Sequence, residues 1–243
     1  MWLLLRGLAR ESGHWGNFPQ LLASRVGESP VSLNLPGCGE RNQERASGNL
    51  SRLLSQVHEK TDPKQKKILV GVSLGGMLAL QWAYEHPEEV RGVVVINSSA
   101  SNLSWPWQRF SPKAIRTLFH ALTSRGEERE KTILELVCNA ENVRRRYLPT
   151  FKVLAEHRPV HFSNARRQLR AARHFRVKKL SQPGLIVVSE KDKLASPVCS
   201  QALASFLNWP IVSHPSAGHD LALEDPAWLA DQIARWSQSL PKN

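Results

Sequence analysis

The sequence predicts an α/β fold in which a mostly parallel sheet of about six strands is covered by helices on both faces. Three observations support this prediction. Short apolar runs alternate with segments of helical periodicity, which is typical of strands joined by crossover helices. The 243 residues, 41% of them hydrophobic, are enough to bury one sizeable core. After Ser101 strand signals vanish for about 80 residues, a segment too long for an ordinary loop.

Six apolar runs account for the strands, and we expect the first five of them to be buried. They span residues 2–5, 30–35, 67–72, 91–97, 183–189 and 210–214. The helices expected between and after them open near residues 16, 49, 74, 196 and 225. This order implies a parallel sheet with helices on both sides.

The arginine-rich segment is predicted to be an inserted helical lid, so that residues 1–101 and 182–243 form the core and 102–181 the lid. Ser111 and Pro112 begin a helix that Gly126 is expected to end, and further helices are expected over 127–138 and 164–176. Residues 102–181 contain eighteen Lys and Arg and six Glu. The resulting net charge of +12 equals that of the whole chain. The charge imbalance therefore belongs to the lid.

The stretch from Lys67 to Tyr84 contains the strongest chemical signal. An apolar strand breaks into Gly71-Val-Ser73-Leu-Gly75 and at once takes up helical periodicity, which is the context of a nucleophile elbow. Glycines at both ends remove Cβ atoms that would collide in so tight a turn. N–H groups at the start of the following helix can bind a developing oxyanion. Ser73 is the predicted nucleophile.

A serine nucleophile needs an imidazole base and a carboxylate that orients it. Asp192 follows a predicted strand and His219 follows the last one, so both belong to the same edge of the sheet as Ser73. Glu190 is an alternative carboxylate and His214 an alternative base. Asp220 is interpreted as a loop cap.

With these pieces in place, the chain resembles the α/β-hydrolase superfamily over nearly its whole length. The matching motifs are Gly71–Gly75, the turn at 35–39, His86-Pro87, Glu190-Lys-Asp192 and Ala217-Gly-His219. The closest resemblance is to small lidded carboxylesterases that act on acyl-carrier-protein esters. The resemblance implies that the N–H groups of Leu8 and Leu74 form the oxyanion hole.

Two features depart from the family pattern. The first antiparallel strand pair is absent, because the chain starts almost on the oxyanion strand. Arg6-Gly7 also replaces the usual His-Gly, which leaves the supporting contacts of the oxyanion hole open.

Several residues are candidates for substrate binding. Trp15 and Trp105 are expected either to line an acyl pocket or to pack as core residues. Arg166, Arg170 and Arg173 recur along one predicted lid helix. This stripe is either a solvated face or a site for anionic substrates or an acidic acyl-carrier protein. Nucleic acid is not expected, because no binding module accompanies the charge.

The predicted function is a serine hydrolase that cleaves a carboxylic ester, either of a small molecule or of a carrier-linked acyl group, without cofactor or metal. Two alternatives remain open: a C–C hydrolase or lyase acting on a carboxylate substrate, and a non-catalytic binding protein. The three scattered cysteines are expected to be reduced thiols. With no signal peptide or membrane span recognised, a cytoplasmic location is expected.

Overall fold

The computed structural model describes residues 1–240 and contains one six-stranded sheet in which every neighbouring pair is parallel. The strands lie in the order β2-β1-β3-β4-β5-β6. Their bounds are β1 Trp2–Leu5, β2 Val31–Leu33, β3 Lys67–Val72, β4 Val90–Ile96, β5 Gly184–Ser189 and β6 Ile211–His214. The α/β-hydrolase fold predicted without its first antiparallel pair is confirmed.

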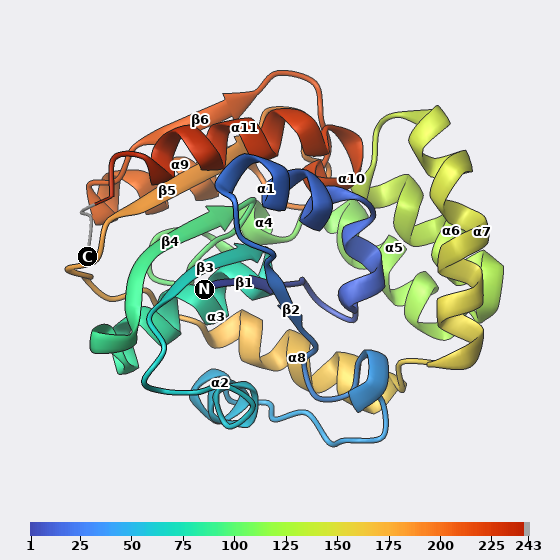
Figure 1. Ribbon diagram of the computed structural model, residues 1–243. Helices are drawn as coiled ribbons and strands as arrows, with labels where there is room; N and C mark the ends of the chain where they lie inside the picture. Colours follow the sequence, from blue (N-terminus) through green and yellow to red (C-terminus); the bar gives the residue numbers. More distant parts are fainter. Residues whose placement is uncertain (241–243) are drawn as a thin grey trace.

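Helices cover both faces of the sheet (Figure 1). Their bounds are α1 Phe18–Val26, α2 Leu50–His58, α3 Leu74–Glu85, α9 Pro197–Leu207, α10 Leu221–Glu224 and α11 Pro226–Ser237. Three single 3₁₀ turns complete this part: Ser12–Trp15, Gly39–Arg41 and Pro87–Glu89.

The central strands feed two cores, because successive side chains of a strand point to opposite faces. Leu3 and Leu5 of β1 join one apolar cluster together with α2 and α3, whereas Trp2 and Leu4 join a second cluster with α1 and α11. The edge strand β2 departs from the expectation that it is buried. Val31 is 44% exposed, since β2 has a neighbour on one side only.

Between β4 and β5 the chain forms five helices. They are α4 Pro106–Arg109, α5 Pro112–Thr123, α6 Gly126–Val137, α7 Glu141–His157 and α8 Phe162–His174. Of these, α5, α6 and α7 lie together at one side of the molecule, whereas α8 runs below α3 near α2 (Figure 1). The Ser111 hydroxyl caps α5 as expected. Gly126 was wrongly predicted to end that helix. It begins α6 instead, with a positive φ of 52°.

Helices α4, α7 and α10 were not predicted. Pro149 lies inside α7, and an internal proline removes a backbone hydrogen bond and normally argues against a helix. Helices α4 and α10 have four residues each, too few for a periodic pattern. None of the described helices is long and apolar enough to cross a lipid bilayer. All three cysteines are unpaired and buried.

Candidate active site

Ser73 lies at the sharp turn between β3 and α3. Its backbone has φ 55° and ψ −117°, a strained conformation for a residue with a side chain. A Cβ on Gly71 would come within 2.3 Å of the Gly75 backbone, and one on Gly75 within 2.0 Å of the Leu5 carbonyl oxygen. Only glycine fits at these two positions, so the surrounding packing fixes the turn that presents Ser73.

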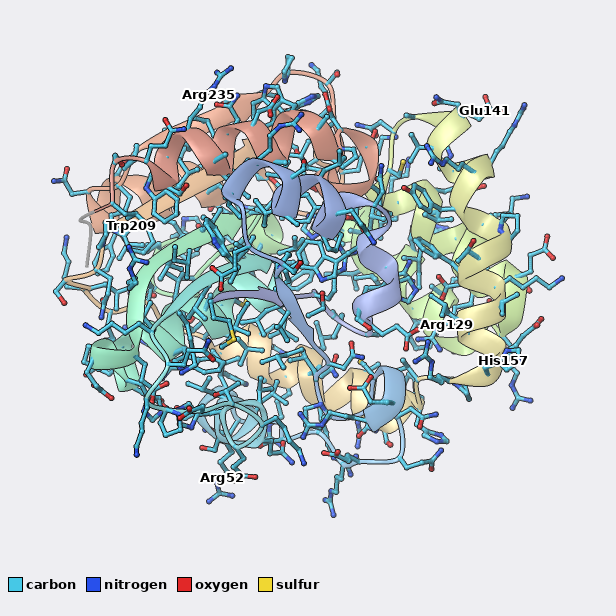
Figure 2. The ribbon with its side chains drawn as sticks, viewed as in Figure 1. Arg52, Arg129, Glu141, His157, Trp209 and Arg235 are labelled. Atoms are coloured by element: carbon cyan, nitrogen blue, oxygen red, sulfur yellow. The ribbon has the colours of Figure 1, made fainter. Side chains whose placement is uncertain are left out.

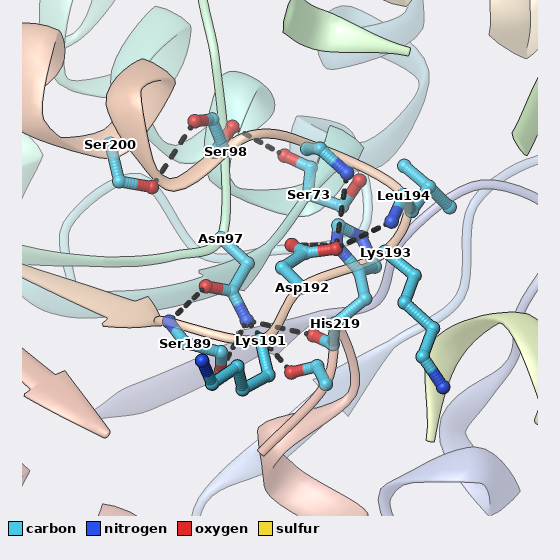
Figure 3. Close-up of polar contacts among 12 residues, drawn as sticks. Ser73, Asn97, Ser98, Ser189, Lys191, Asp192, Lys193, Leu194, Ser200 and His219 are labelled. Atoms are coloured by element: carbon cyan, nitrogen blue, oxygen red, sulfur yellow. Dashed lines mark hydrogen bonds and ion pairs between the residues drawn. The ribbon is translucent and has the colours of Figure 1, made fainter. Parts of the chain in front are cut away.

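Asp192 and His219 meet at the same edge of the sheet (Figure 3). The Nδ1 of His219 lies 2.6 Å from Oδ2 of Asp192, and both side chains are buried. The other carboxylate oxygen, Oδ1, accepts hydrogen bonds from the backbone N–H groups of Leu194 and Ala195 at 2.8 and 3.0 Å. Asp192 is therefore fixed, and its Oδ2 is the atom directed at the imidazole.

The environment changes the proton affinity of the imidazole. Burial lowers the pKa of His219, but the charge and hydrogen bond of Asp192 outweigh it, so the pKa is raised above the ordinary 6.5. Because a carboxylate can only accept, Nδ1 of the neutral ring carries the proton and Nε2 is left as the base.

The alternative carboxylate and the alternative base have different surroundings. Glu190 is exposed and accepts no contact from His219. His214 contacts Asp225 at 3.3 Å, and its Nδ1 accepts the N–H of Ala217 at 3.0 Å, so it holds the loop before His219.

Asn97 also positions this loop and was not recognised in the sequence. It follows β4 with a φ of 47° and is buried. Its amide nitrogen donates to the His219 carbonyl at 2.9 Å, and its amide oxygen accepts from the Ser189 N–H at 2.8 Å. Asn97 thereby ties the His219 loop to the end of β5.

A cavity of about 70 Å³ brings Ser73 and His219 together with Leu8 and Leu74. Leu74 is the first residue of α3, so its N–H has no acceptor within the helix. Most of the other lining side chains are apolar. Trp15 and Trp105 do not line this cavity: Trp15 is fully buried against Phe18, and Trp105 is 64% exposed.

Comparison with known proteins agrees with this geometry. The family model described as "Alpha/beta hydrolase family" matches residues 2–232. The chain belongs to the alpha/beta hydrolase family. Solved structures similar in fold include a putative non-heme bromoperoxidase from Mycobacterium tuberculosis H37Rv, with a TM-score of 0.77 and 17% identity over 99% of this chain and 92% of that one. A thermophilic esterase from Thermogutta terrifontis has a TM-score of 0.71 and 17% identity over 98% and 89% of the two chains.

Curated relatives of this alpha/beta hydrolase include esterases. A biotin biosynthesis bifunctional protein from Teredinibacter turnerae is 24% identical over 95% of this chain and 43% of its own length. A pimeloyl-[acyl-carrier protein] methyl ester esterase from Yersinia pseudotuberculosis is 31% identical over 50% of this chain and 45% of its own. The chain thus spans less than half the length of these two relatives.

Arg6, which departs from the usual histidine of the family, is buried and forms a two-pronged ion pair with Asp220. Its guanidinium also lies 4.7 Å from the Trp15 ring. The side chain of Asp220 was wrongly interpreted as a loop cap, since it makes no cap bond to α10 and instead joins the His219 loop to the end of β1. The Arg6–Asp220 ion pair thus connects the segment after β1 with the His219 loop.

Gln168 of α8 supports the turn after β1 and was also missed. It is fully buried, and its amide oxygen accepts the N–H of Ala9 at 2.9 Å. Ala9 has a φ of 55°, a strained conformation, directly after Leu8. The side-chain amide nitrogen of Gln168 donates to the Pro36 carbonyl at 3.0 Å. A helix between β4 and β5 therefore fixes the position of the Leu8 backbone.

The three predicted arginines of α8 do not share one surface. Arg166 and Arg173 line a groove of about 700 Å³ between α4, α5 and α8, together with the exposed apolar side chains of Phe119 and Phe162. Arg170 lies in different hollows, beside Gly48 and Arg52. The groove adjoins the Ser73 cavity, because Phe110 and Leu118 line both.

One group of side chains has the composition of a metal site. The candidate ligand atoms of His58, His86 and Glu89 lie within 4.8 Å of one another. However, the fully buried Lys67 ammonium donates to Glu89 at 2.9 Å. Since this cation already neutralises the carboxylate, the group does not fit a divalent metal ion.

Proposed function

We propose that this alpha/beta hydrolase is a serine enzyme that cleaves carboxylic esters through an acyl-enzyme. The observation that supports it is the fixed Asp192–His219 pair on the cavity where the strained Ser73 turn lies. A carboxylate that binds Nδ1 of a buried imidazole leaves Nε2 as the nitrogen that can take a proton.

Ser73 attacks the ester carbonyl carbon while Nε2 of His219 takes the hydroxyl proton, which forms a tetrahedral intermediate. The N–H groups of Leu8 and Leu74 stabilise its oxyanion. Collapse breaks the bond to the alcohol, which leaves with the proton from His219. Water then repeats the sequence, releases the acid and restores Ser73, while Asp192 keeps the imidazole oriented throughout.

The decisive experiment combines labelling with turnover. A fluorophosphonate should label the purified chain at Ser73, and the chain should hydrolyse short 4-nitrophenyl esters. Ser73→Ala should abolish labelling and lower kcat by about 10⁶-fold. Ser98→Ala is the matched control, because it removes a neighbouring hydroxyl that only binds the Ser73 carbonyl, and it should remain labelled. A wild-type chain that is neither labelled nor active would refute the proposal.

The groove suggests the chemistry of the part of the substrate that lies outside the Ser73 cavity. Its apolar floor and its rim of Arg166, Arg173 and Arg176 suit the anionic, partly apolar arm of a carrier-linked acyl group. The Yersinia pseudotuberculosis relative is named as an esterase of a pimeloyl-[acyl-carrier protein] methyl ester, which is a carrier-linked substrate. We propose that residues 102–181 act as a lid that presents this groove to an acidic carrier protein.

Charge reversal separates this surface from general basicity. Arg166→Glu with Arg173→Glu should weaken binding of an acidic acyl-carrier protein in a salt-sensitive way. Arg170→Glu with Arg52→Glu makes the same change of charge on the neighbouring surface and should have little effect. Equal losses from both pairs would mean that only net charge matters and would remove the carrier proposal.

A further inference from the structure

The cavity beside Ser73 is apolar over most of its wall, but three arginine side chains also line it. They belong to Arg6, Arg10 and Arg129, which are 3%, 6% and 8% exposed. Arg6 and Arg10 come from the segment after β1, and Arg129 comes from α6 where that helix approaches the segment (Figure 2). Burying three cations beside a reactive serine is costly unless each has a partner.

Two of the three arginines are neutralised within the protein. Arg6 is paired with Asp220 through both of its terminal nitrogens. Arg10 donates to Glu130 at 2.5 Å. These two carboxylates are therefore occupied.

Arg129 has no carboxylate partner among the described residues. Its one hydrogen bond runs from Nη1 to the Val160 carbonyl at 3.1 Å, and its buried Nε has no acceptor. Arg10 likewise leaves its Nε and Nη2 unpaired. The nearby carboxylate of Glu11 is bridged at 2.9 Å by Arg158. Arg10 and Arg129 thus keep unsatisfied N–H groups, and both side chains line the cavity that also contains Ser73.

We infer that Arg129, with Arg10 beside it, binds the free carboxylate of an acyl group whose ester carbonyl lies at Ser73. A guanidinium presents two parallel N–H groups that match a carboxylate, and such a charged pair is favoured where water is excluded. The substrates would be half-esters of dicarboxylic acids. This inference rests on the proposed esterase function and specifies its substrate class.

The size of the cavity limits the length of the acid. Its volume of about 70 Å³ holds roughly five water-sized groups. That is enough for two or three methylene groups and a carboxylate, as in succinyl and glutaryl chains. The alcohol or carrier arm then extends past Phe110 and Leu118 into the neighbouring groove.

The test compares substrates of equal shape and different charge. Monomethyl succinate and methyl 4-methylpentanoate differ only in whether the chain ends in a carboxylate or an isopropyl group. The wild-type chain should hydrolyse the half-ester with a kcat/KM about 10- to 100-fold higher. Arg129→Met should abolish or reverse this preference, and Arg129→Lys should retain part of it, because lysine keeps the charge without the fork.

Arg145→Met is the matched control, since Arg145 is an exposed arginine of the adjacent α7, and it should leave the preference unchanged. Free succinate should inhibit the wild-type chain more strongly than 4-methylpentanoate, a comparison that needs no variant. If the wild-type chain hydrolyses the neutral ester equally well or better, or if Arg129→Met keeps the preference, the subsite is refuted and the esterase proposal stands. Absence of labelling at Ser73 would instead refute the esterase itself.

Discussion

Asp192 with His219 and Arg10 with Glu130 are two buried ion pairs near one cavity, and their members reach each other by different routes. Asp192 and His219 follow the neighbouring strands β5 and β6, so sheet pairing brings them together. Arg10 and Glu130 are 120 residues apart, on a loop after β1 and on α6. The first pair is a consequence of the sheet, whereas the second exists only because the helices between β4 and β5 pack against the loop. Under the proposals above, the first pair acts in the reaction, whereas the second neutralises Arg10 and leaves Arg129 as the guanidinium that binds the substrate.

The largest effect should come from breaking the pair at the sheet edge. In Asp192→Asn the amide oxygen should take the place of Oδ1, because only an oxygen can accept the two backbone hydrogen bonds there. The amide NH₂ then takes the place of Oδ2, the acceptor that faced His219. The imidazole must then accept at Nδ1 and protonate Nε2, which prevents it from taking the serine proton. We expect kcat to fall about 10⁴-fold.

Glu190→Gln is the control for this prediction, because Glu190 is an exposed carboxylate two residues away. It should retain nearly wild-type kcat for a short 4-nitrophenyl ester. Loss of activity in Glu190→Gln with activity retained in Asp192→Asn would assign the orienting carboxylate to Glu190.

The second pair should matter more for stability than for the chemical step. Glu130→Gln removes the charge opposite Arg10 and leaves two buried guanidinium groups, Arg10 and Arg129, without a carboxylate. Removing one partner of a buried pair costs about 3–5 kcal/mol of unfolding free energy. Urea unfolding should therefore give a clearly lower midpoint.

An exposed ion pair with the same distance between its charged atoms provides the comparison. Arg145 and Glu141 also lie 2.5 Å apart, but their side chains are 80% and 63% exposed. Glu141→Gln should unfold at close to the wild-type urea concentration, because water screens an exposed pair. Equal midpoints for the two variants would show that burial does not distinguish the pairs.

The same contrast explains how much of this molecule the sequence can predict. Ser73, Asp192 and His219 could be proposed from the sequence because each follows a strand at the same edge of the sheet. Trp15 resembled a pocket residue, yet it packs in the core, because aromatic residues serve both purposes and their spacing does not distinguish them.

The contacts between the N-terminal segment and the helices α4–α8 were beyond prediction. Gln168 and Arg129 are ordinary polar residues in a helical pattern, and only the packing of α6 and α8 brings them to the segment containing Leu8. Pro149 concealed α7 as well, so the arrangement of these helices had no local signature.

A smaller effect should follow from removing the support of the Leu8 turn. Gln168→Leu leaves the Ala9 N–H without its acceptor, and an unsatisfied buried donor costs about 1–3 kcal/mol. Under the proposed mechanism this cost raises the free energy of the transition state, in which the Leu8 N–H binds the oxyanion. We expect kcat to fall about 10- to 100-fold with little change in KM.

Asn164→Leu is matched to this variant, because Asn164 is a buried polar residue of the same helix that binds Ala46 and Glu44 instead of the Leu8 turn. It should lower stability but leave kcat per labelled Ser73 near the wild-type value. A similar loss of kcat in both variants would mean that general loosening of α8 is responsible.

The smallest effect should be a shift in pH dependence caused by the ion pair beside His219. Activity requires the neutral imidazole, so kcat/KM should rise with pH through a pKa above 6.5. Asp220 raises the pKa of His219 and Arg6 lowers it. Asp220→Asn should therefore move the acid limb to lower pH, and Arg6→Met should move it to higher pH.

The double variant, Arg6→Met with Asp220→Asn, removes both charges and should return the acid limb close to its wild-type position. A pair that only braced the two loops would lower kcat in each variant without moving the limb in opposite directions. Opposite shifts that cancel in the double variant can arise only from charge acting on His219. They would place the arginine that replaces the usual family histidine in the electrostatics of the base as well as in the packing of the oxyanion turn.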